Sequence, residues 1–198
     1  MGKVTTHMTM SLDGYIADPS DQVGELFDWY QAGDVAVGHA SDDLGEFNVD
    51  KASAEVLRDM LTKAGALITG RHLFDIANGW NDAHPAGAKV VVVTHEPPAD
   101  AAETWPKTTF VGGVEEAVAK AKELAGDKDV SIASANVIQQ ALNLGLVDEV
   151  AVSLVPVLFG AGKSYFGRLD DGHLMLEDPD VVKGHRAVHL LFKVHRPT

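Results

Sequence analysis

Residues 8–17 carry the first side chains whose types and spacing could do chemistry, and they read Met-Thr-Met-Ser-Leu-Asp-Gly-Tyr-Ile-Ala. A strand that starts at Lys3 runs into a turn in which Asp13 and Tyr15 flank Gly14. Glycine reaches backbone conformations that are closed to other residues, so the chain can reverse here and present a carboxylate and a phenol. In an open α/β sheet such a turn borders the ligand crevice at the carboxyl ends of the strands. A plain strand-to-loop connection has the same sequence, so the turn alone leaves both interpretations open.

Two later strand ends carry residues suited to binding a phosphate. Thr69, Gly70 and Arg71 follow an apolar strand and open a predicted helix. A helix N-terminus attracts anions through its dipole and its free N–H groups, and an arginine adds a bidentate contact. The next apolar strand ends at Thr94 and His95, whose hydroxyl and imidazole could bind a ribose or its phosphate. A surface arginine and ordinary loop residues are the alternative interpretation.

A third strand-to-helix junction is built from small side chains, Ala133-Ser134-Ala135-Asn136. Small residues let a backbone approach a pyrophosphate closely, whereas Ser134 could equally serve only as the N-cap of the helix. The segment Gly160-Ala161-Gly162-Lys163-Ser164 has the second half of a P-loop. The complete pattern needs glycine where this chain has Val157, so ATP-dependent phosphotransfer is the least supported hypothesis. The nine histidines show no metal-ligand spacing, and we predict no metal site.

The elements that position these residues alternate between strands and helices. Four consecutive valines at 90–93 are typical of a central parallel strand that is buried on both faces. Ser53 has the position of an N-cap before a helix with an apolar face. Further strands are predicted at 3–9, 66–69, 108–111, 130–132 and 147–155, further helices at 25–30, 114–125 and from 135, and an antiparallel pair near 173–182 and 185–195. This order predicts an α/β fold, a mostly parallel sheet with helices on both faces and an antiparallel C-terminal edge.

Composition narrows the classes of partner. A length of 198 residues fits a single domain over residues 1–198. The formal net charge of −13 argues against a broad nucleic-acid face, which needs clustered lysine and arginine, and against an anionic membrane surface. No apolar run approaches the roughly 20 residues of a membrane-spanning helix. The absence of cysteine excludes disulfides and thiolate chemistry and suits a cytoplasmic enzyme.

As a set, these motifs resemble a known family. The motifs are residues 10–17, Thr69-Gly70-Arg71 with Phe74-Asp75, Val91–His95, and Gly145–Glu149 followed by Pro156–Gly162. In this order they resemble the dihydrofolate-reductase-like superfamily, and specifically the RibD C-terminal type, the reductase domain of bacterial riboflavin biosynthesis. The likeness extends over roughly residues 3–195.

The resemblance implies a three-layer dihydrofolate-reductase-like fold and NADPH as the hydride donor. It implies that Ile16 and Ala17 lie beside the nicotinamide, and that the turn at 133–137 cradles the pyrophosphate. The implied cofactor-binding residues are Ile16, Ala17, Thr69, Gly70, Arg71, Thr94, His95, Ser134, Ala135, Asn136 and Val137.

The resemblance also implies a substrate side of the crevice. Asp13, Tyr15 and Trp29 would face the substrate. Residues 25–33 resemble the helix that bears the catalytic acid in the folate reductases, so Asp28 is the candidate acid and Asp13 the second candidate. Relatives of this type often pair, and we therefore expect a homodimer.

One departure from the family concerns the turn at 133–137, which we expect on the side of the crevice opposite residues 13–17. The family usually has two glycines before the helix that starts at Ala135, whereas this chain has Ala133-Ser134. Without glycine, a strained backbone there costs about 1–3 kcal/mol. We expect either a shifted loop, weaker cofactor binding or a different ligand.

Two hypotheses from different classes follow. The leading one is an NADPH-dependent reductase that transfers a hydride to a small pterin- or aminopyrimidine-like heterocycle, with a positioned acid supplying the proton. The alternative is a non-catalytic nucleotide-binding or regulatory domain on the same fold, motivated by Ala133-Ser134 and by the lack of a clear acid. Turnover of NADPH distinguishes the two.

Overall fold

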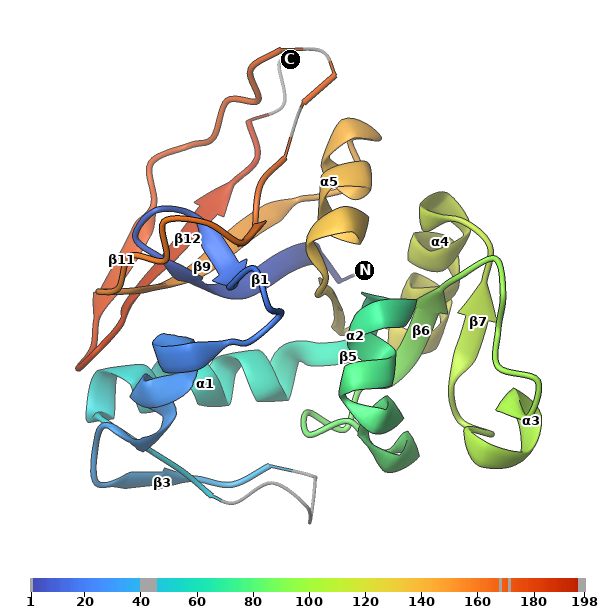
Figure 1. Cartoon of the computed structure of the whole chain (residues 1–198), viewed down its shortest axis with the longest axis horizontal. Helices are drawn as coiled ribbons and strands as arrows, with labels where there is room; N and C mark the ends of the chain where they lie inside the picture. The colour runs from blue at the N-terminus through green and yellow to red at the C-terminus, as the bar shows by residue number, and fades with distance from the viewer. Residues whose placement is uncertain (1, 40–45, 168, 171, 196–198) are drawn as a thin grey trace.

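An eight-stranded sheet forms the centre of the molecule (Figure 1). The computed structural model describes residues 2–39, 46–167, 169–170 and 172–195. In chain order the strands of this sheet are β1 (Val4–Ser11), β5 (Ala64–Gly70), β6 (Lys89–Val93), β7 (Thr109–Val111), β8 (Asp129–Ile132), β9 (Glu149–Val155), β11 (Asp180–Lys183) and β12 (Val188–Lys193). Two small sheets pair β2 (Tyr15–Ala17) with β10 (Lys163–Ser164) and β3 (Val35–Val37) with β4 (Phe47–Val49).

The central sheet is mostly parallel, as the sequence predicts. Its spatial order is β11-β12-β9-β1-β8-β5-β6-β7. All neighbours from β9 to β7 run parallel, whereas β12 is antiparallel to β9 and β11 is antiparallel to β12. The carboxyl ends of six strands therefore meet along one edge, where the candidate residues follow them.

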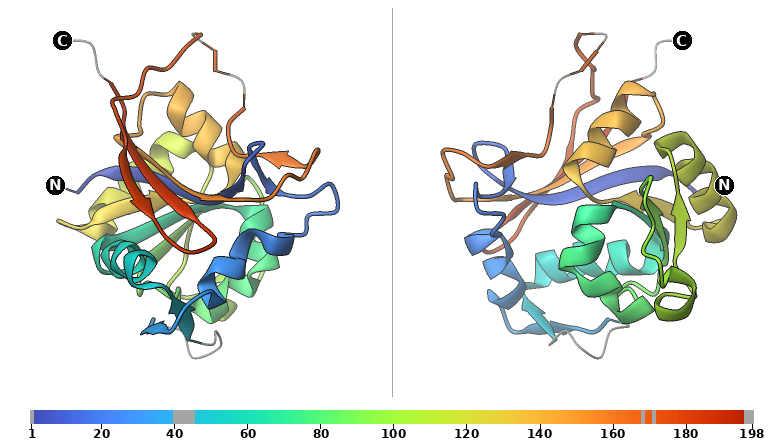
Figure 2. Two further views of the ribbon diagram at one scale, coloured as in Figure 1. Left: turned by 90° about the vertical axis from the view of Figure 1, so that its left-hand side faces the viewer. Right: turned by 45° about the vertical axis from the view of Figure 1, so that its right-hand side comes forward.

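Helices cover both faces of the sheet. They are α1 (Lys51–Lys63), α2 (Arg71–Ile76), α3 (Ala101–Thr104), α4 (Val114–Ala125) and α5 (Ala135–Asn143), with the 3-10 helices η1 (Gly24–Gln31) and η2 (Asn78–Asp82). In the left view of Figure 2, α4 and α5 lie above the sheet, and α1 and η1 lie below it. The three-layer α/β architecture is confirmed. Over the described ranges, every helix is too short or too polar to cross a membrane.

The two faces of the sheet differ in polarity. On the upper face, Val4, Ile68 and Ile132 pack in one apolar cluster with Val137 and Ile138 of α5. On the lower face, β1 presents Thr5, His7, Thr9 and Ser11, because successive side chains of a strand point to opposite faces. A central parallel strand is usually apolar on both faces. The polar stripe of β1 therefore needs partners on the side of α1.

Helix α1 begins earlier than its apolar pattern indicates. Asp50 is the N-cap, and its carboxylate accepts hydrogen bonds from the backbone N–H groups of Ala52 at 2.9 Å and Ser53 at 3.2 Å. The expected cap, Ser53, instead donates its hydroxyl to Asp50 Oδ2 at 2.6 Å. Aspartate and serine are both favoured at the N-cap position. Asp50 takes it here because its two carboxylate oxygens accept hydrogen bonds from several donors. The C-terminal strands, β11 and β12, are also shorter than predicted.

Candidate functional site

Asp13 connects the turn after β1 to the turn at Phe159 and Gly160 through hydrogen bonds. Its Oδ1 accepts hydrogen bonds from Ser11 Oγ at 2.6 Å and from the N–H of Phe159 at 3.1 Å, and its Oδ2 accepts from the N–H of Gly160 at 2.7 Å. The Ser11 hydroxyl, helped by these backbone donors, lowers the pKa of Asp13 even though burial opposes the shift. A carboxyl group held in its ionised form is a poor proton donor. The geometry therefore favours a structural role for Asp13 over the catalytic role we expected.

Ile16 and Ala17, the expected lip of the ligand crevice, lie on the short strand β2. Strand β2 pairs antiparallel with β10, which places Tyr15 opposite Ser164 and Ala17 opposite Lys163. A Cβ on Gly162 would lie 2.0 Å from the Ala17 carbonyl oxygen, so only glycine allows this close approach. Ile16 and Ala17 are 9% and 6% exposed, and Tyr15 is half-buried. The two buried residues can offer a ligand their backbone groups more readily than their side chains.

Arg71 and Thr94 meet around the turn that follows β6. Arg71 donates from Nε to Asp75 Oδ1 and from Nη1 to the carbonyl oxygen of Glu96, both at 2.7 Å. Thr94 Oγ1 accepts a hydrogen bond from the N–H of Glu96 at 3.1 Å. His95 is exposed beside them. The structure thus brings together the residues that the sequence assigned to a phosphate.

The sequence prediction missed Gly112 and Gly113, which lie at the same edge. A Cβ on Gly113 would meet nothing within 4 Å, and one on Gly112 would meet only His95 Nδ1 at 3.8 Å. Gly113 is the N-cap of α4 and provides no side-chain cap for the first N–H groups of the helix. The space in front of His95 and α4 is therefore open and lined by donors, as an anionic ligand requires. A glycine pair before a helix is the sequence signal that could have identified it.

Ser134 adopts a glycine-like backbone conformation. Its φ is +99°, which side chains rarely adopt, so the departure from the usual glycines leaves a strained residue. Its Oγ lies 3.0 Å from Thr69 Oγ1 and accepts the N–H of Gly70 at 3.0 Å. These bonds tie the ends of β8 and β5 together. Ser134 occupies the N-cap position of α5, as the alternative interpretation predicts, but it makes no side-chain cap hydrogen bond, because its hydroxyl is used at the ends of β5 and β8.

The other residues of this turn differ in what they can offer a ligand. Asn136 is exposed, and its side-chain oxygen accepts a hydrogen bond from Gln140 Nε2 at 2.7 Å. Val137 is 2% exposed and belongs to the core. It can therefore contribute a backbone N–H to a ligand but no side-chain contact. Ala135 is half-buried between them.

A pair of substitutions separates the strain of Ser134 from its hydrogen bonds. Ser134→Ala keeps a Cβ at φ +99° and removes the partner of the Gly70 N–H, so we expect the free energy of unfolding to fall by about 1–3 kcal/mol. Ser134→Gly loses the same bonds but relieves the strain, and it should be about 1 kcal/mol more stable than the alanine variant. Urea denaturation measures both. If the alanine variant is as stable as the glycine variant, the backbone of Ser134 is not strained.

The two residues expected on η1 do not face the crevice together. Asp28 is exposed and lies 3.8 Å from Arg186 Nη2, on the side of the β11–β12 hairpin. Trp29 is completely buried, with its Nε1 3.4 Å from Thr9 Oγ1 and its ring 4.9 Å from that of His189. The prediction that Trp29 contacts substrate is therefore wrong. In a 3-10 helix residues three apart share a face, so Leu26 and Trp29 turn inward and Asp28 turns outward.

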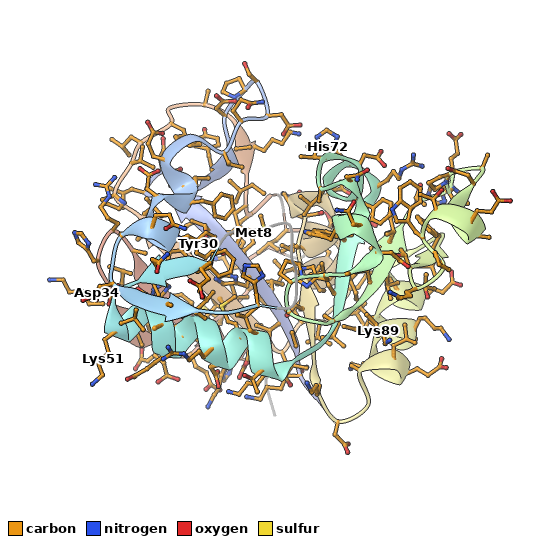
Figure 3. All side chains as sticks on the ribbon, turned by 90° about the horizontal axis from the view of Figure 1, so that it is seen from below. Met8, Tyr30, Asp34, Lys51, His72 and Lys89 are labelled. Carbon is orange, nitrogen blue, oxygen red and sulfur yellow. The ribbon has the colours of Figure 1, made fainter. Side chains whose placement is uncertain are left out.

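An ionic cluster ties the loop after β2 to the start of α2. The Asp21 carboxylate pairs with both His72 and Lys163, and Lys163 Nζ lies 3.0 Å from His72 Nε2. Hydrogen bonding from Lys163 and then from His72 lowers the pKa of Asp21. Lys163 is therefore an ion-pair residue here, which explains why half of a P-loop is present without its helix. His72, labelled in Figure 3, and Asp21 were not predicted.

A second polar group that the sequence prediction missed lies on the lower face of the sheet. His7 Nε2 is 3.0 Å from Ser153 Oγ, which is 2.9 Å from His189 Nδ1. His189 Nε2 is in turn 3.0 Å from Ser53 Oγ, which donates to Asp50. The five side chains come from β1, β9, β12, α1 and the N-cap of α1, and we call them the His7–Asp50 chain. They give His7 its partners, while Thr5, Thr9 and Ser11 of the same stripe contact Glu149, Trp29 and Asp13.

The His7–Asp50 chain makes stability depend on pH. Burial, helped by the proximity of His189, lowers the pKa of His7 from 6.5 to about 4. Between these values the unfolded chain binds a proton that the folded chain does not, so we expect the free energy of unfolding to fall as the pH drops from 6.5 to 4. Urea denaturation at several pH values measures this. His7→Leu should flatten the slope, and an unchanged slope would contradict the assignment.

A three-layer fold with this strand order and a donor-lined edge defines the class of dihydrofolate-reductase-like proteins. Within the described residues, no group of three or more His, Asp or Glu forms a metal site. A family model described as the RibD C-terminal domain matches residues 2–190. The chain belongs to the RibD C-terminal domain family and is an oxidoreductase of the dihydrofolate-reductase-like type.

Solved structures share this fold at low sequence identity. A protein from Shewanella sp. PV-4 assigned to riboflavin biosynthesis matches with a TM-score of 0.66 and 23% identity, over 98% of this chain and 99% of the other. Dihydrofolate reductase from Enterococcus faecalis, solved with NADP(H), matches with a TM-score of 0.62 and 14% identity, over 98% of each chain. RibD of Acinetobacter baumannii matches with a TM-score of 0.59 and 18% identity, over 98% of this chain but 58% of RibD. No curated protein matches the sequence significantly.

Proposed function

We propose that the chain is an NADPH-dependent reductase that transfers a hydride to a small pterin- or aminopyrimidine-like heterocycle. The observation that carries the proposal is the convergence of Arg71, Thr94 and His95 with the open space at Gly112 and Gly113. The structure of the Enterococcus faecalis enzyme with NADP(H), on the same fold, supports the choice of cofactor.

The residues present fit a dinucleotide that extends along the crevice edge. Arg71 uses two of its five N–H donors in bonds to Asp75 and Glu96, so others remain for an adenine-side phosphate. The backbone at Ala135 and Val137 would face the pyrophosphate, and Ile16 and Ala17 the nicotinamide. When bound, NADPH supplies the hydride, while the lip at Ile16 and Ala17 orients its ring against the substrate.

Neither carboxylate that we expected to supply the proton is arranged to donate it. Asp13 is held in its ionised form by the turn it fastens, and Asp28 faces Arg186. Tyr15 is the expected substrate-side residue that stays at the lip, where its backbone N–H donates to Ser11 Oγ at 2.9 Å. We therefore propose Tyr15 as the substrate contact.

A non-catalytic nucleotide-binding domain is the second candidate function. It is favoured by the positions of Asp13 and Asp28, since neither carboxylate is arranged as a proton donor to the crevice. Both candidates predict that NADPH binds, and they differ in turnover.

Following the nicotinamide absorbance with pterin and aminopyrimidine substrates tests the two candidates. Oxidation of NADPH that depends on the substrate supports the reductase. Binding of NADPH without oxidation by any of these substrates supports the non-catalytic domain, and failure to bind NADPH contradicts both.

The homodimer and the cytoplasmic location remain predictions. Light scattering coupled to size-exclusion chromatography measures the first, and a mass close to one chain would contradict it.

A further inference from the structure

A pocket of about 380 Å³ lies between α1 and the lower face of the sheet. Its walls include His7, Ser153 and His189 from the strands and Val56 and Met60 from α1. Figure 3 looks onto this side, with α1 in front of β1, where Met8 is labelled. The pocket extends to Lys3, Asp129 and Glu149 at the starts of their strands. It therefore opens toward the end of the sheet opposite the cofactor crevice.

The His7–Asp50 chain gives this pocket a defined hydrogen-bonding polarity. Burial acts to raise the pKa of Asp50, but hydrogen bonds from Ser53 and from the N–H of His185 outweigh it and lower the pKa. The ionised carboxylate only accepts, so Ser53 must donate to Asp50 and accept from His189 Nε2–H. His189 Nδ1 is then an acceptor and receives the Ser153 hydroxyl.

The same hydrogen bonds determine which ring nitrogen of His7 carries the proton. The Ser153 oxygen, whose proton goes to His189, accepts from His7 Nε2–H. In a neutral imidazole the other nitrogen, Nδ1, is then a bare acceptor. It makes no hydrogen bond to any residue that the structure describes. Because the pKa of His7 is lowered to about 4, chiefly by burial, the ring stays neutral and Nδ1 stays an acceptor near pH 7.

The charges around the pocket are predominantly negative. Its lining contains five carboxylates and two lysines: Glu55, Asp59, Asp129, Glu149, Asp180, Lys3 and Lys63. Both lysines are paired, Lys3 with Glu149 and Lys63 with Asp59. A surplus of negative charge raises the local concentration of cations and repels anions.

We propose that this pocket binds a small cationic or uncharged molecule that donates an N–H group to Nδ1 of His7. Apolar walls, among them Met60 and Leu191, would enclose its body, while the carboxylates would exclude anions such as phosphates. None of the residues proposed to hold the cofactor lines this pocket. The site goes beyond the proposed reductase function and does not depend on it.

Benzamidine and benzoate test the proposal as a matched pair of probes. They have the same size and shape, but benzamidine is a cationic N–H donor and benzoate is an anionic acceptor. In NMR titrations of the full chain without NADPH, benzamidine should shift the resonances of His7, Ser153 and His189, whereas benzoate should shift none of them. Equal binding of the two probes, or no binding of benzamidine, would overturn the proposal.

Variants locate the contact. His7→Leu should weaken benzamidine binding about tenfold, because it removes the acceptor of one hydrogen bond from the probe. His84→Leu is the control, since His84 is also a histidine whose pKa burial lowers to about 4, but it lines another pocket. If His7→Leu does not fold, Ser53→Ala provides the second test. It breaks the His7–Asp50 chain outside the pocket and should also weaken binding. Unchanged benzamidine affinity in His7→Leu, or in Ser53→Ala if His7→Leu does not fold, would overturn the proposal.

Discussion

Replacing Arg71 by glutamine is expected to weaken NADPH binding by about 10- to 100-fold. Hydrogen bonds between an arginine and a phosphate are charge-assisted and contribute about 1.5–3 kcal/mol, which corresponds to this range. Arg71 lies at the start of α2 with its guanidinium directed to the turn at Glu96, next to Thr94. Isothermal titration calorimetry of NADPH measures the change.

Arg58→Gln is the matched control for Arg71. Arg58 also belongs to a helix and donates from Nη2 to a backbone oxygen, that of Ala36 at 3.1 Å, but it lies on α1. We expect this variant to bind NADPH as tightly as the unmodified chain. Equal affinity of the Arg71 and Arg58 variants would show that Arg71 holds no phosphate.

Replacing Trp29 by alanine is expected to lower the free energy of unfolding by about 3–5 kcal/mol. Truncation of a buried tryptophan removes its apolar contacts and leaves a cavity. Trp29 is completely buried with Leu26 and Val155 in the cluster below the sheet, and its ring also packs on His189. Chemical denaturation followed by circular dichroism gives the change.

Two further variants separate the contributions at this position. Trp29→Phe keeps most of the buried ring and loses the contact between Nε1 and Thr9, so its loss should be smaller than that of alanine. Phe27, two residues earlier on η1, is 37% exposed, and Phe27→Ala should cost less than either. A Trp29→Ala variant as stable as the Phe27→Ala variant would contradict the buried position of the indole.

The order of elements along the chain and the mostly parallel sheet were accessible from the sequence because they depend on local patterns. Apolar runs such as 90–93 and helix-ending glycines mark each element, and parallel strands bring their ends to one edge. For this reason Arg71 and Thr94, which follow neighbouring strands, lie together around Glu96. Asp50, in contrast, was overlooked as the cap of α1, because serine and aspartate three residues apart compete for one position.

The features that the sequence did not predict depend on contacts between residues that are distant in the sequence. The orientation of η1 follows a period of three rather than 3.6, so the roles of Asp28 and Trp29 could not be separated from their spacing. His7 and Ser153 are 146 residues apart, and only the pairing of β1 with β9 brings them together. Likewise, the φ of Ser134 follows from its bonds to Thr69 and Gly70 across the sheet edge.

A crystal structure of the chain soaked with NADPH tests the central proposal most directly. We predict density for the dinucleotide along the carboxyl edge, with the nicotinamide beside Ala17 and the pyrophosphate at the turn of Ser134. An adenine-side phosphate should lie within hydrogen-bonding distance of Arg71. An empty edge at saturating NADPH, or a dinucleotide bound away from both Ala17 and Ser134, would contradict the account.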